Sequence, residues 1–313
     1  MSVLVAVKNL HKDFADFKAV NGVSFSVEEG QVLGFLGPNG AGKTTTMRMI
    51  TGYLNPSSGS VKVGGVDVLE NPLEARENIG YLPEGGPLYG DMTPASFLSF
   101  ISKVRGLSDS KRRERMDFVV EKLGISDVFY KTIETLSKGY KRRVALAQAI
   151  LHDPKVLILD EPTDGLDPNQ KFDVRQLILQ MAKEKAIVIS THILEEVDAV
   201  CTNAIIISDG KIVASGQPKE LTEKDPKNNA VFVKLYKSPV DAILNDVLQI
   251  KSVERVNVEG KNSIIAYPKK GKEILSNVSA VVRKLKAPVE TIYVMPGDLN
   301  DSFRKYTKSS TEK

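Results

Sequence analysis

The segment Gly37–Thr45 (GPNGAGKTT) has the composition and spacing of a loop that binds phosphate groups. It matches the pattern G-x-x-x-x-G-K-[ST], follows a short apolar run and precedes a helical pattern. Its glycines let main-chain N–H groups converge on an anion, and the N-terminus of the helix adds a favourable dipole. We expect Lys43 to neutralise the β- and γ-phosphates of a nucleotide and the Thr44 hydroxyl to ligate Mg²⁺. The candidate nucleotide contacts in this loop are Asn39, Gly40, Ala41, Gly42, Lys43, Thr44 and Thr45.

Two adjacent acids, Asp160 and Glu161, directly follow the apolar run Val156–Leu159. An ionised carboxylate is costly to bury without a partner, so a cation is expected beside this pair. A nucleotide-bound metal ion would supply it, and Asp160 is predicted to hold the Mg²⁺ that bridges the phosphates. Glu161 is predicted to act as the general base that activates the attacking water, with Lys43 in the same catalytic set.

Three further motifs follow the phosphate loop in a fixed order. They are LSKGY (Leu136–Tyr140), DGLD (Asp164–Asp167) and STHILEEVDAVC, which contains His192. In this order and at this spacing, the motifs resemble those of the ATP-binding cassette (ABC) family. LSKGY is similar to the family's signature loop, with Lys138 and Tyr140 in place of the common Gly and Gln.

This resemblance implies a head-to-tail dimer, either a homodimer or a pseudo-dimer of nucleotide-binding subunits, with two ATP molecules between the copies. Ser137 and Gly139 are then expected to bind the γ-phosphate of the ATP held by the opposite subunit. Asp164–Asp167 matches the loop that couples the two sites. His192 stands at the family's switch position, where it is expected to contact the γ-phosphate.

Two more positions are similar to those of the family. Phe14 stands where the family stacks an aromatic ring on adenine, and Val20 is expected near the ribose. In IGYLPEGGPLY, Glu84 replaces the glutamine that the family places between its two subdomains. Its carboxylate is expected to reach Mg²⁺ or the attacking water.

The elements that must position these residues follow an α/β pattern. Short apolar runs rich in β-branched residues indicate buried parallel strands at Gln31–Leu36, Val156–Leu159, Ala186–Ser190 and Ala204–Ile207. A helix is predicted over Lys43–Ile50. Between Pro94 and Tyr130 the pattern is helical, and a helix there is expected to begin near Ser108–Ser110 and to end at Gly124. We therefore predict the core of a phosphate-loop (P-loop) NTPase of the ABC type with an inserted helical subdomain.

The periodicity restarts beyond a polar stretch, which predicts a second domain. We expect an ABC ATPase domain over residues 1–221, with its helical subdomain at about 92–150, and a linker over 222–229. The order βαββαβ over residues 230–313 indicates a small α+β accessory domain with a ferredoxin-like fold. Only Lys308–Lys313 is expected to be disordered.

The composition is that of a folded, non-membrane protein. The 313 residues carry 42% hydrophobic and 26% charged residues and a net charge of +4. The single cysteine, Cys201, excludes an intrachain disulfide and fits a reducing compartment. No signal-peptide pattern and no apolar run of the roughly 20 residues needed to cross a bilayer is present. We expect a cytoplasmic protein, peripheral on the inner face of the cell membrane through a partner.

The resemblance covers the whole chain and indicates which branch of the ABC family the chain is most similar to. The end PGDLNDSFRKYT (Pro296–Thr307) is similar to that of ATPases serving bacterial type-two exporters, and PEGGPLY is similar to the gliding-motility transporter group. The resemblance implies an ATPase that drives a separate integral membrane permease, with ATP and Mg²⁺ as cofactors and no nucleic-acid partner. Cargo contacts belong to the permease, so the cargo is not encoded here.

Two alternatives stay open at this point. The first is a soluble ABC ATPase acting on ribosomes or nucleic acid. Such proteins usually carry two cassettes or long coiled-coil insertions, whereas this chain has one phosphate loop and a compact insertion. The second is a phosphate-loop GTPase, which lacks support because no N-K-x-D guanine-reading motif occurs.

Overall fold

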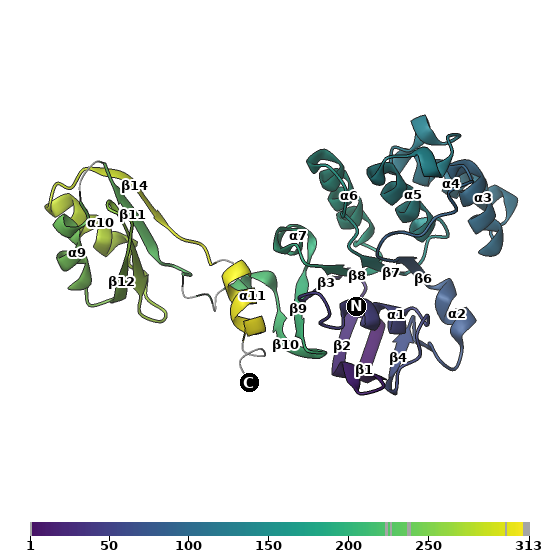
Figure 1. Cartoon of the computed structure of the whole chain (residues 1–313), viewed down its shortest axis with the longest axis horizontal. Coiled ribbons are helices and arrows are strands. Elements are labelled where there is room, and N and C mark those ends of the chain that lie inside the picture. Colours follow the sequence, from purple (N-terminus) through teal and green to yellow (C-terminus); the bar gives the residue numbers. More distant parts are fainter. Residues whose placement is uncertain (1, 223–224, 226, 237–238, 298, 309–313) are drawn as a thin grey trace. The chain divides into compact units, whose positions relative to one another are not determined.

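The computed structural model describes residues 2–222, 225, 227–236, 239–297 and 299–308 (Figure 1). The strands are β1 (Val3–Phe14), β2 (Phe17–Glu28), β3 (Val32–Leu36), β4 (Ser58–Val63), β5 (Val66–Asp67), β6 (Ile79–Leu82), β7 (Val156–Asp160), β8 (Ala186–Thr191), β9 (Asn203–Ser208), β10 (Lys211–Gly216), β11 (Val231–Leu235), β12 (Val253–Glu259), β13 (Ser263–Pro268) and β14 (Val289–Val294). The helices are α1 (Lys43–Ile50), α2 (Pro72–Glu77), α3 (Pro94–Val104), α4 (Asp109–Lys122), α5 (Lys138–Ile150), α6 (Pro168–Met181), α7 (Leu194–Val200), α8 (Pro218–Thr222), α9 (Asp241–Leu248), α10 (Leu275–Lys284) and α11 (Leu299–Lys308). The strands and the helix predicted around the phosphate loop and the acidic pair are confirmed, with ends that differ by about one residue.

Three neighbouring strands of a six-stranded sheet bring the predicted site together. The strand order is β10-β9-β3-β8-β7-β6, and β3, β8 and β7 run parallel. In this register Leu36 lies beside Thr191, and Asp160 lies beside Ser190. The phosphate loop follows β3, the acidic pair ends β7, and His192 follows β8. All three therefore lie at the carboxyl edge of the sheet, where open α/β sheets bind ligands.

The six-stranded sheet separates two hydrophobic cores. Leu157 and Leu159 of β7 point into a core shared with α3, α4, α5 and α6. Val156 and Ile158, which alternate with them, point into a core shared with α1, β1, β2 and β4. Figure 1 shows α3 to α6 on one side of the six-stranded sheet and α1, β1, β2 and β4 on the other. Burial on both faces explains why the strands read as unbroken apolar runs.

An antiparallel sheet, with strand order β2-β1-β4-β5, was not predicted from the sequence. The pairing of β1 with β2 has several register shifts, among them one between the pairs of Val7 and Leu10. Each shift moves the buried side chains out of strict alternation, so the pattern of period two is lost. The β1–β2 hairpin ends with Phe14 opposite Phe17.

The predicted helical insertion forms α3 and α4, which are followed by α5. Thr93 caps α3 in a reciprocal pair with Ser96. Ser108, one of the predicted starting residues, caps α4 and accepts a hydrogen bond from the Lys111 N–H. Gly124 follows α4 with a φ of 57°, a conformation in which a glycine carries no Cβ penalty.

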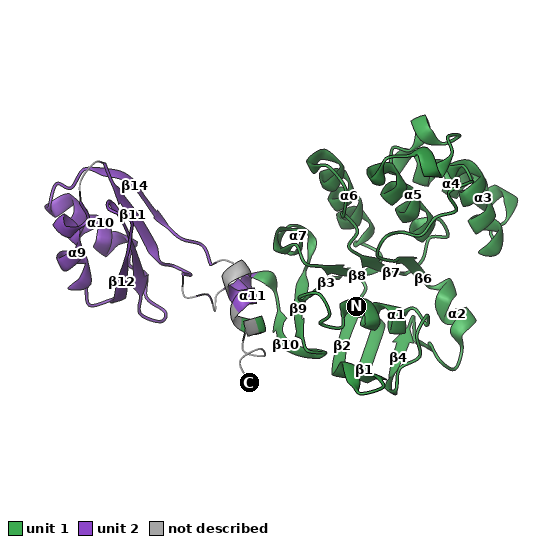
Figure 2. Cartoon of the chain, in the orientation of Figure 1, with its two compact units in different colours: residues 1–218, 306–313 green, residues 219–305 purple. Residues whose placement is uncertain are grey.

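The contacts within the chain define two compact units (Figure 2), one of Met1–Pro218 with Tyr306–Lys313 and the other of Lys219–Lys305. The second unit has the predicted order of elements, β11-α9-β12-β13-α10-β14. Its antiparallel sheet has the strand order β12-β13-β11-β14, and α9 and α10 pack against the sheet to form a separate core.

The end of the chain departs from the prediction. Helix α11 was not predicted, because its sequence is polar and short. Lys308, which was expected to begin a disordered tail, is the last residue of this helix. The rest of that predicted tail, residues 309–313, lies outside the described residues. In the part of the chain that is described, the helices are too short or too polar to cross a membrane.

Candidate nucleotide site

A cleft of about 340 Å³ at the carboxyl edge of the six-stranded sheet collects most of the predicted site. It is lined by Phe14, Phe17, Ala19, Asn39, Gly40, Gly42, Lys43, Thr44, Thr45, Glu84, Asp160 and Glu161. The antiparallel hairpin, the phosphate loop, the end of β7 and the loop after β6 each contribute. Residues far apart in the sequence thus meet in one cleft.

The phosphate loop requires glycine where its backbone approaches other segments. Gly42 has a φ of 103°, and a Cβ there would lie 2.4 Å from the carbonyl oxygen of Ala19. Lys43 begins α1 and is only 7% exposed. Its Nζ donates hydrogen bonds to the carbonyl oxygens of Gly37 (2.7 Å) and Pro38 (3.2 Å). The lysine therefore holds the loop in a curve around the place where an anion would bind.

The charges around Lys43 are unbalanced. Burial lowers the pKa of the Lys43 ammonium, while the negative charges of Glu161, Asp160 and Glu84 act in the opposite direction. The same three carboxylates also act on the Arg142 guanidinium, so three acids face two side-chain cations. A nucleotide triphosphate would add further negative charge, so a metal cation is the natural complement of this site.

Asp160 is 1% exposed, and its Oδ2 has no hydrogen-bond partner among the described residues. The Oγ of Ser190, the neighbouring residue on β8, is also buried without a partner in the described structure. Buried polar atoms are normally paired, so these two oxygens fit a site that a hard cation or its water ligands complete. The described residues contain no group of three or more His, Cys, Asp or Glu side chains that would hold a metal alone. The donor set therefore fits an ion that also takes oxygen ligands from phosphate.

Glu161 and His192 are in direct contact. The Nδ1 of His192 lies 2.9 Å from Oε1 of Glu161, and the His192 side chain is 59% exposed. The main-chain N–H of Glu161 donates to the carbonyl oxygen of Ser190 at 2.9 Å. The strand order β7–β8 thus places the predicted base and the predicted switch histidine within one hydrogen-bonded pair.

Five predicted residues do not line the cleft: His192, whose contact with Glu161 is described above, and four others. Val20 is fully buried behind Gly42, and Ala41 is 4% exposed within the loop. Ser137 caps α5 by accepting a hydrogen bond from the Tyr140 N–H at 3.3 Å. A Cβ on Gly139 would lie 2.5 Å from Oε1 of Gln170, which accounts for glycine at that position.

Two residues that line the cleft, Phe17 and Ala19, were missed by sequence reasoning. Phe17 pairs with Phe14 across the hairpin turn, and the two rings are 61% and 46% exposed. The sequence feature that could have indicated Phe17 is its position, since Phe14 and Phe17 flank a two-residue turn. This feature indicates a hairpin only once β1 and β2 are recognised as strands, and they were not predicted.

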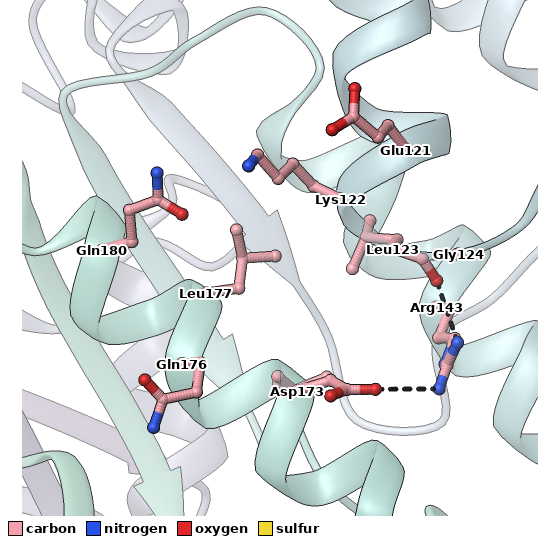
Figure 3. Close-up of a pocket in the computed structure, with 10 residues that line it drawn as sticks. Glu121, Lys122, Leu123, Gly124, Arg143, Asp173, Gln176, Leu177 and Gln180 are labelled. Carbon is pink, nitrogen blue, oxygen red and sulfur yellow. Dashed lines mark hydrogen bonds and ion pairs between the residues drawn. The ribbon is translucent and has the colours of Figure 1, made fainter.

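A second cleft, of about 300 Å³, lies between α4, α5 and α6 (Figure 3). Its lining includes Arg143, which donates to the carbonyl oxygen of Leu123 at 3.1 Å and lies 3.7 Å from Asp173. None of the predicted site residues lines this cleft. It is therefore separate from the nucleotide site, and Arg143 acts there as a link between helices.

The mainly parallel sheet, the loop that wraps around Lys43 and the cleft at the sheet's edge define a phosphate-loop nucleotide-binding protein. The family model for the ABC transporter matches residues 20–164. The uncharacterized ABC transporter ATP-binding protein YxlF of Bacillus subtilis (strain 168) is 37% identical over 80% of this chain and 82% of its own. The Nod factor export ATP-binding protein I of Ralstonia nicotianae is 30% identical over 97% of this chain and 94% of its own.

A solved ATP-binding subunit of an ABC transporter superposes with a TM-score of 0.67 at 28% identity, over 71% of this chain and 92% of that one. The chain belongs to the ABC transporter family as an ATP-binding subunit, and it is an ATPase. The GTPase alternative is thereby excluded. Neither relative is named for ribosomes or nucleic acid, so the soluble alternative has no support.

Proposed function

We propose that this ATPase drives export through a separate permease, to which it binds on the inner face of the cell membrane. The observation that carries this proposal is a groove of about 820 Å³ bordered by the end of α1, by α2, β6 and α3. Tyr53, Leu73 and Val104 line it and are 76%, 76% and 66% exposed. Large exposed apolar side chains around one hollow are typical of a contact with another protein. The occupant that we assign is a cytoplasmic segment of the permease.

The groove is connected to the nucleotide cleft by one strand. Ile79 and Tyr81 of β6 line the groove, and β6 ends at Leu82. Glu84, only two residues further on, lines the nucleotide cleft. A segment bound in the groove therefore acts on the same short stretch of main chain that positions this carboxylate.

The direction of transport rests on the relatives. The relative that is named for Nod factor export aligns with 97% of this chain, which supports an exporter. The assignment to the gliding-motility-like group remains a prediction. The cargo is a property of the permease in this proposal, and no nucleic acid takes part.

Within the cleft, each residue has an assigned role. Lys43 binds the β- and γ-phosphates, and Phe14 stacks on the adenine ring with its exposed face. Glu161 takes the proton of the attacking water, and His192 orients that carboxylate through their 2.9 Å contact. Val20 packs behind Gly42 and supports the phosphate loop. Any effect of Val20 on the ribose is therefore indirect, through the position of this loop.

Thr44 and Asp160 are the residues that would hold Mg²⁺, since both line the cleft and the Asp160 Oδ2 has no partner among the described residues. When bound, Mg²⁺ neutralises charge on the phosphates and orients them. Glu84 is placed to reach the ion or a water bound to it. Its negative charge, where the family has glutamine, adds to the requirement for a cation in this site.

The second half of the reaction centre comes from another subunit. Ser137 and Lys138 are exposed at the start of α5, a thirteen-residue helix whose first turn offers the N–H groups of Lys138 and Gly139 to an anion, while that of Tyr140 is capped by Ser137. We propose that Ser137 and Gly139 bind the γ-phosphate of an ATP molecule held by a second copy, or by a similar subunit, in a head-to-tail dimer. In this proposal the closed dimer excludes bulk water from both sites and retains the attacking water.

The Glu84→Ala variant tests the link between groove and nucleotide. We expect the permease-stimulated rate of ATP hydrolysis to fall about tenfold, equivalent to losing one hydrogen bond of about 1.5 kcal/mol to a charged group. The affinity for Mg-ATP should change far less. ATPase assays of the purified permease complex and of the subunit alone separate these effects.

Glu70→Ala is the matched control for Glu84→Ala, because Glu70 is an exposed acid outside both the groove and the cleft. If Glu84→Ala keeps the parent's permease-stimulated rate of ATP hydrolysis, this carboxylate does not link the permease to the nucleotide site. If Leu73→Ser and Val104→Ser leave the permease bound with its usual affinity, the groove is not the docking surface.

For the second unit we propose a ferredoxin-like accessory domain, separated from the ATPase domain (residues 1–221) by the linker 222–229. Its βαββαβ order, its sheet order and its own core support this assignment. All residues that line the nucleotide cleft belong to the first unit. The accessory domain is therefore assigned to regulation of the dimer or to contact with the permease.

A chain that ends at Thr222 is expected to remain folded and to bind ATP with an affinity within about twofold of the full chain. The reason is that the described residues of the nucleotide cleft and of both cores around the six-stranded sheet all precede residue 213. Thermal unfolding and ATP titration measure the two properties, with the Lys43→Ala form of the same truncation as the control for binding. Insolubility at several neighbouring endpoints would show one continuous domain.

A further inference from the structure

Glu161 has an unusual backbone conformation for the residue that carries the proposed base. Strand β7 ends at Asp160, and Glu161 follows with a φ of 52°, in the left-handed region. A residue with a Cβ is disfavoured there, so its surroundings must hold it in place. The N–H of Glu161 is bonded to Ser190, but this bond does not fix the carbonyl groups on either side of Glu161.

Arg142 of α5 provides the missing contacts. It is 7% exposed, and its Nη2 donates to the carbonyl oxygens of Asp160 and Glu161. Its Nη1 donates to the carbonyl oxygen of Pro83 at 3.0 Å, and its Nε donates to that of Pro162 at 3.4 Å. One guanidinium group thus binds the two peptide units that flank Glu161 and also the residue before Glu84.

The choice of arginine follows from geometry. A guanidinium group presents five N–H donors in a rigid plane, whereas a lysine ammonium is a single point on a flexible stem. Burial lowers the pKa of Arg142, and the nearby Asp164, Asp160, Glu161 and Glu84 act in the opposite direction. Within the described structure its hydrogen bonds go to main-chain carbonyls, so the side chain serves the loop's shape instead of a single ion pair.

We infer that Arg142 is a positioning residue for Glu161: it fixes the left-handed turn after β7 and so aims the carboxylate at the attacking water. This inference rests on the proposed role of Glu161 as general base. Through Pro83, the same side chain also sets the start of the segment that carries Glu84. Because Arg142 belongs to α5, the helix that Ser137 caps, the turn is tied to the element that contacts the partner's nucleotide in the proposed dimer.

The test measures kcat and KM for Mg-ATP in the full-length chain. Arg142→Gln is expected to lower kcat about 100-fold, the effect of misplacing a catalytic group by about 1 Å, with KM nearly unchanged. Arg142→Lys keeps the charge without the planar fork, and it should recover only a small part of the rate. It also serves as the folded variant if the glutamine form is unstable.

Arg143→Gln is the matched control. Arg143 is the next residue on α5 and also donates to a main-chain carbonyl, but it lines the separate cleft of Figure 3. Its replacement should lower the melting temperature without lowering kcat. Equal losses of kcat in the Arg142 and Arg143 variants would show a general effect of loosening α5 and would overturn the positioning role.

A double mutant separates this inference from the proposed function. When Glu161 is already glutamine, Arg142→Gln should cost little further rate, because there is no base left to aim. If Glu161→Gln itself keeps the parent rate, the proposed base fails. If Glu161→Gln is slow but Arg142→Gln keeps the parent kcat, or if the two losses multiply in the double mutant, only the role of Arg142 is overturned.

Discussion

Replacing Glu161 by glutamine is expected to slow ATP hydrolysis by about 10²–10⁴-fold while leaving Mg-ATP binding intact. Glutamine keeps the shape of the side chain and still offers an oxygen to His192, which lies 2.9 Å from the Glu161 carboxylate. It cannot accept the proton of the attacking water. The variant should therefore accumulate as an ATP-bound dimer. Light scattering after size-exclusion chromatography should give the mass of a dimer with Mg-ATP and that of a monomer without it.

Asp160→Asn is the informative companion to Glu161→Gln. Asp160 is buried, with an oxygen that the described residues leave without a partner, so we expect its loss to weaken the Mg²⁺ dependence of nucleotide binding. The neighbouring acids should thus have separable phenotypes, one in chemistry and one in metal binding. A Glu161→Gln protein that stays monomeric and hydrolyses ATP at the parent rate would refute both the base and the ATP sandwich.

Replacing Lys43 by alanine is expected to weaken ATP binding about 10- to 100-fold, because a hydrogen bond to a charged group contributes about 1.5–3 kcal/mol. Hydrolysis should become undetectable, since the β- and γ-phosphates lose their lysine cation. Lys43 is also buried and bonded to Gly37 and Pro38, so the variant should be less stable as well.

Nucleotide titration followed by fluorescence or calorimetry measures the affinity, and thermal unfolding measures the stability. Lys62→Ala, on an exposed position of β4, controls for loss of a positive charge. A folded Lys43→Ala protein with near-normal turnover would contradict the assignment of Gly37–Thr45 as the phosphate loop.

The sequence was most informative where chemistry constrains both residue type and spacing. The phosphate loop and the acids after β7 were located because glycines, a lysine and two carboxylates at these positions suit few roles besides binding a nucleotide and its metal ion. Four strands of the six-stranded sheet, β3, β7, β8 and β9, were predicted from apolar runs such as Val156–Leu159, which are buried on both faces. These features depend on local sequence, so a single chain was sufficient to find them.

Other features depend on contacts that local sequence does not encode. The antiparallel sheet was missed because bulges in β1 break the alternation of its side chains, and Phe17 and Ala19 were missed with it. Arg142 looked like one more basic residue on a helix. Its importance appears only when Pro83 and Glu161, distant in sequence, are brought to its guanidinium group.

The hairpin that borders the nucleotide cleft has a consequence for base selectivity. Its side chains in the cleft are those of Phe14, Phe17 and Ala19, which carry no hydrogen-bonding group. A purine ring can stack on such a surface, but these side chains cannot distinguish a 6-amino from a 6-oxo group. Preference for the adenine nucleotide would then be set by its abundance in the cell more than by the protein, and the discriminating contacts would be those made to the triphosphate.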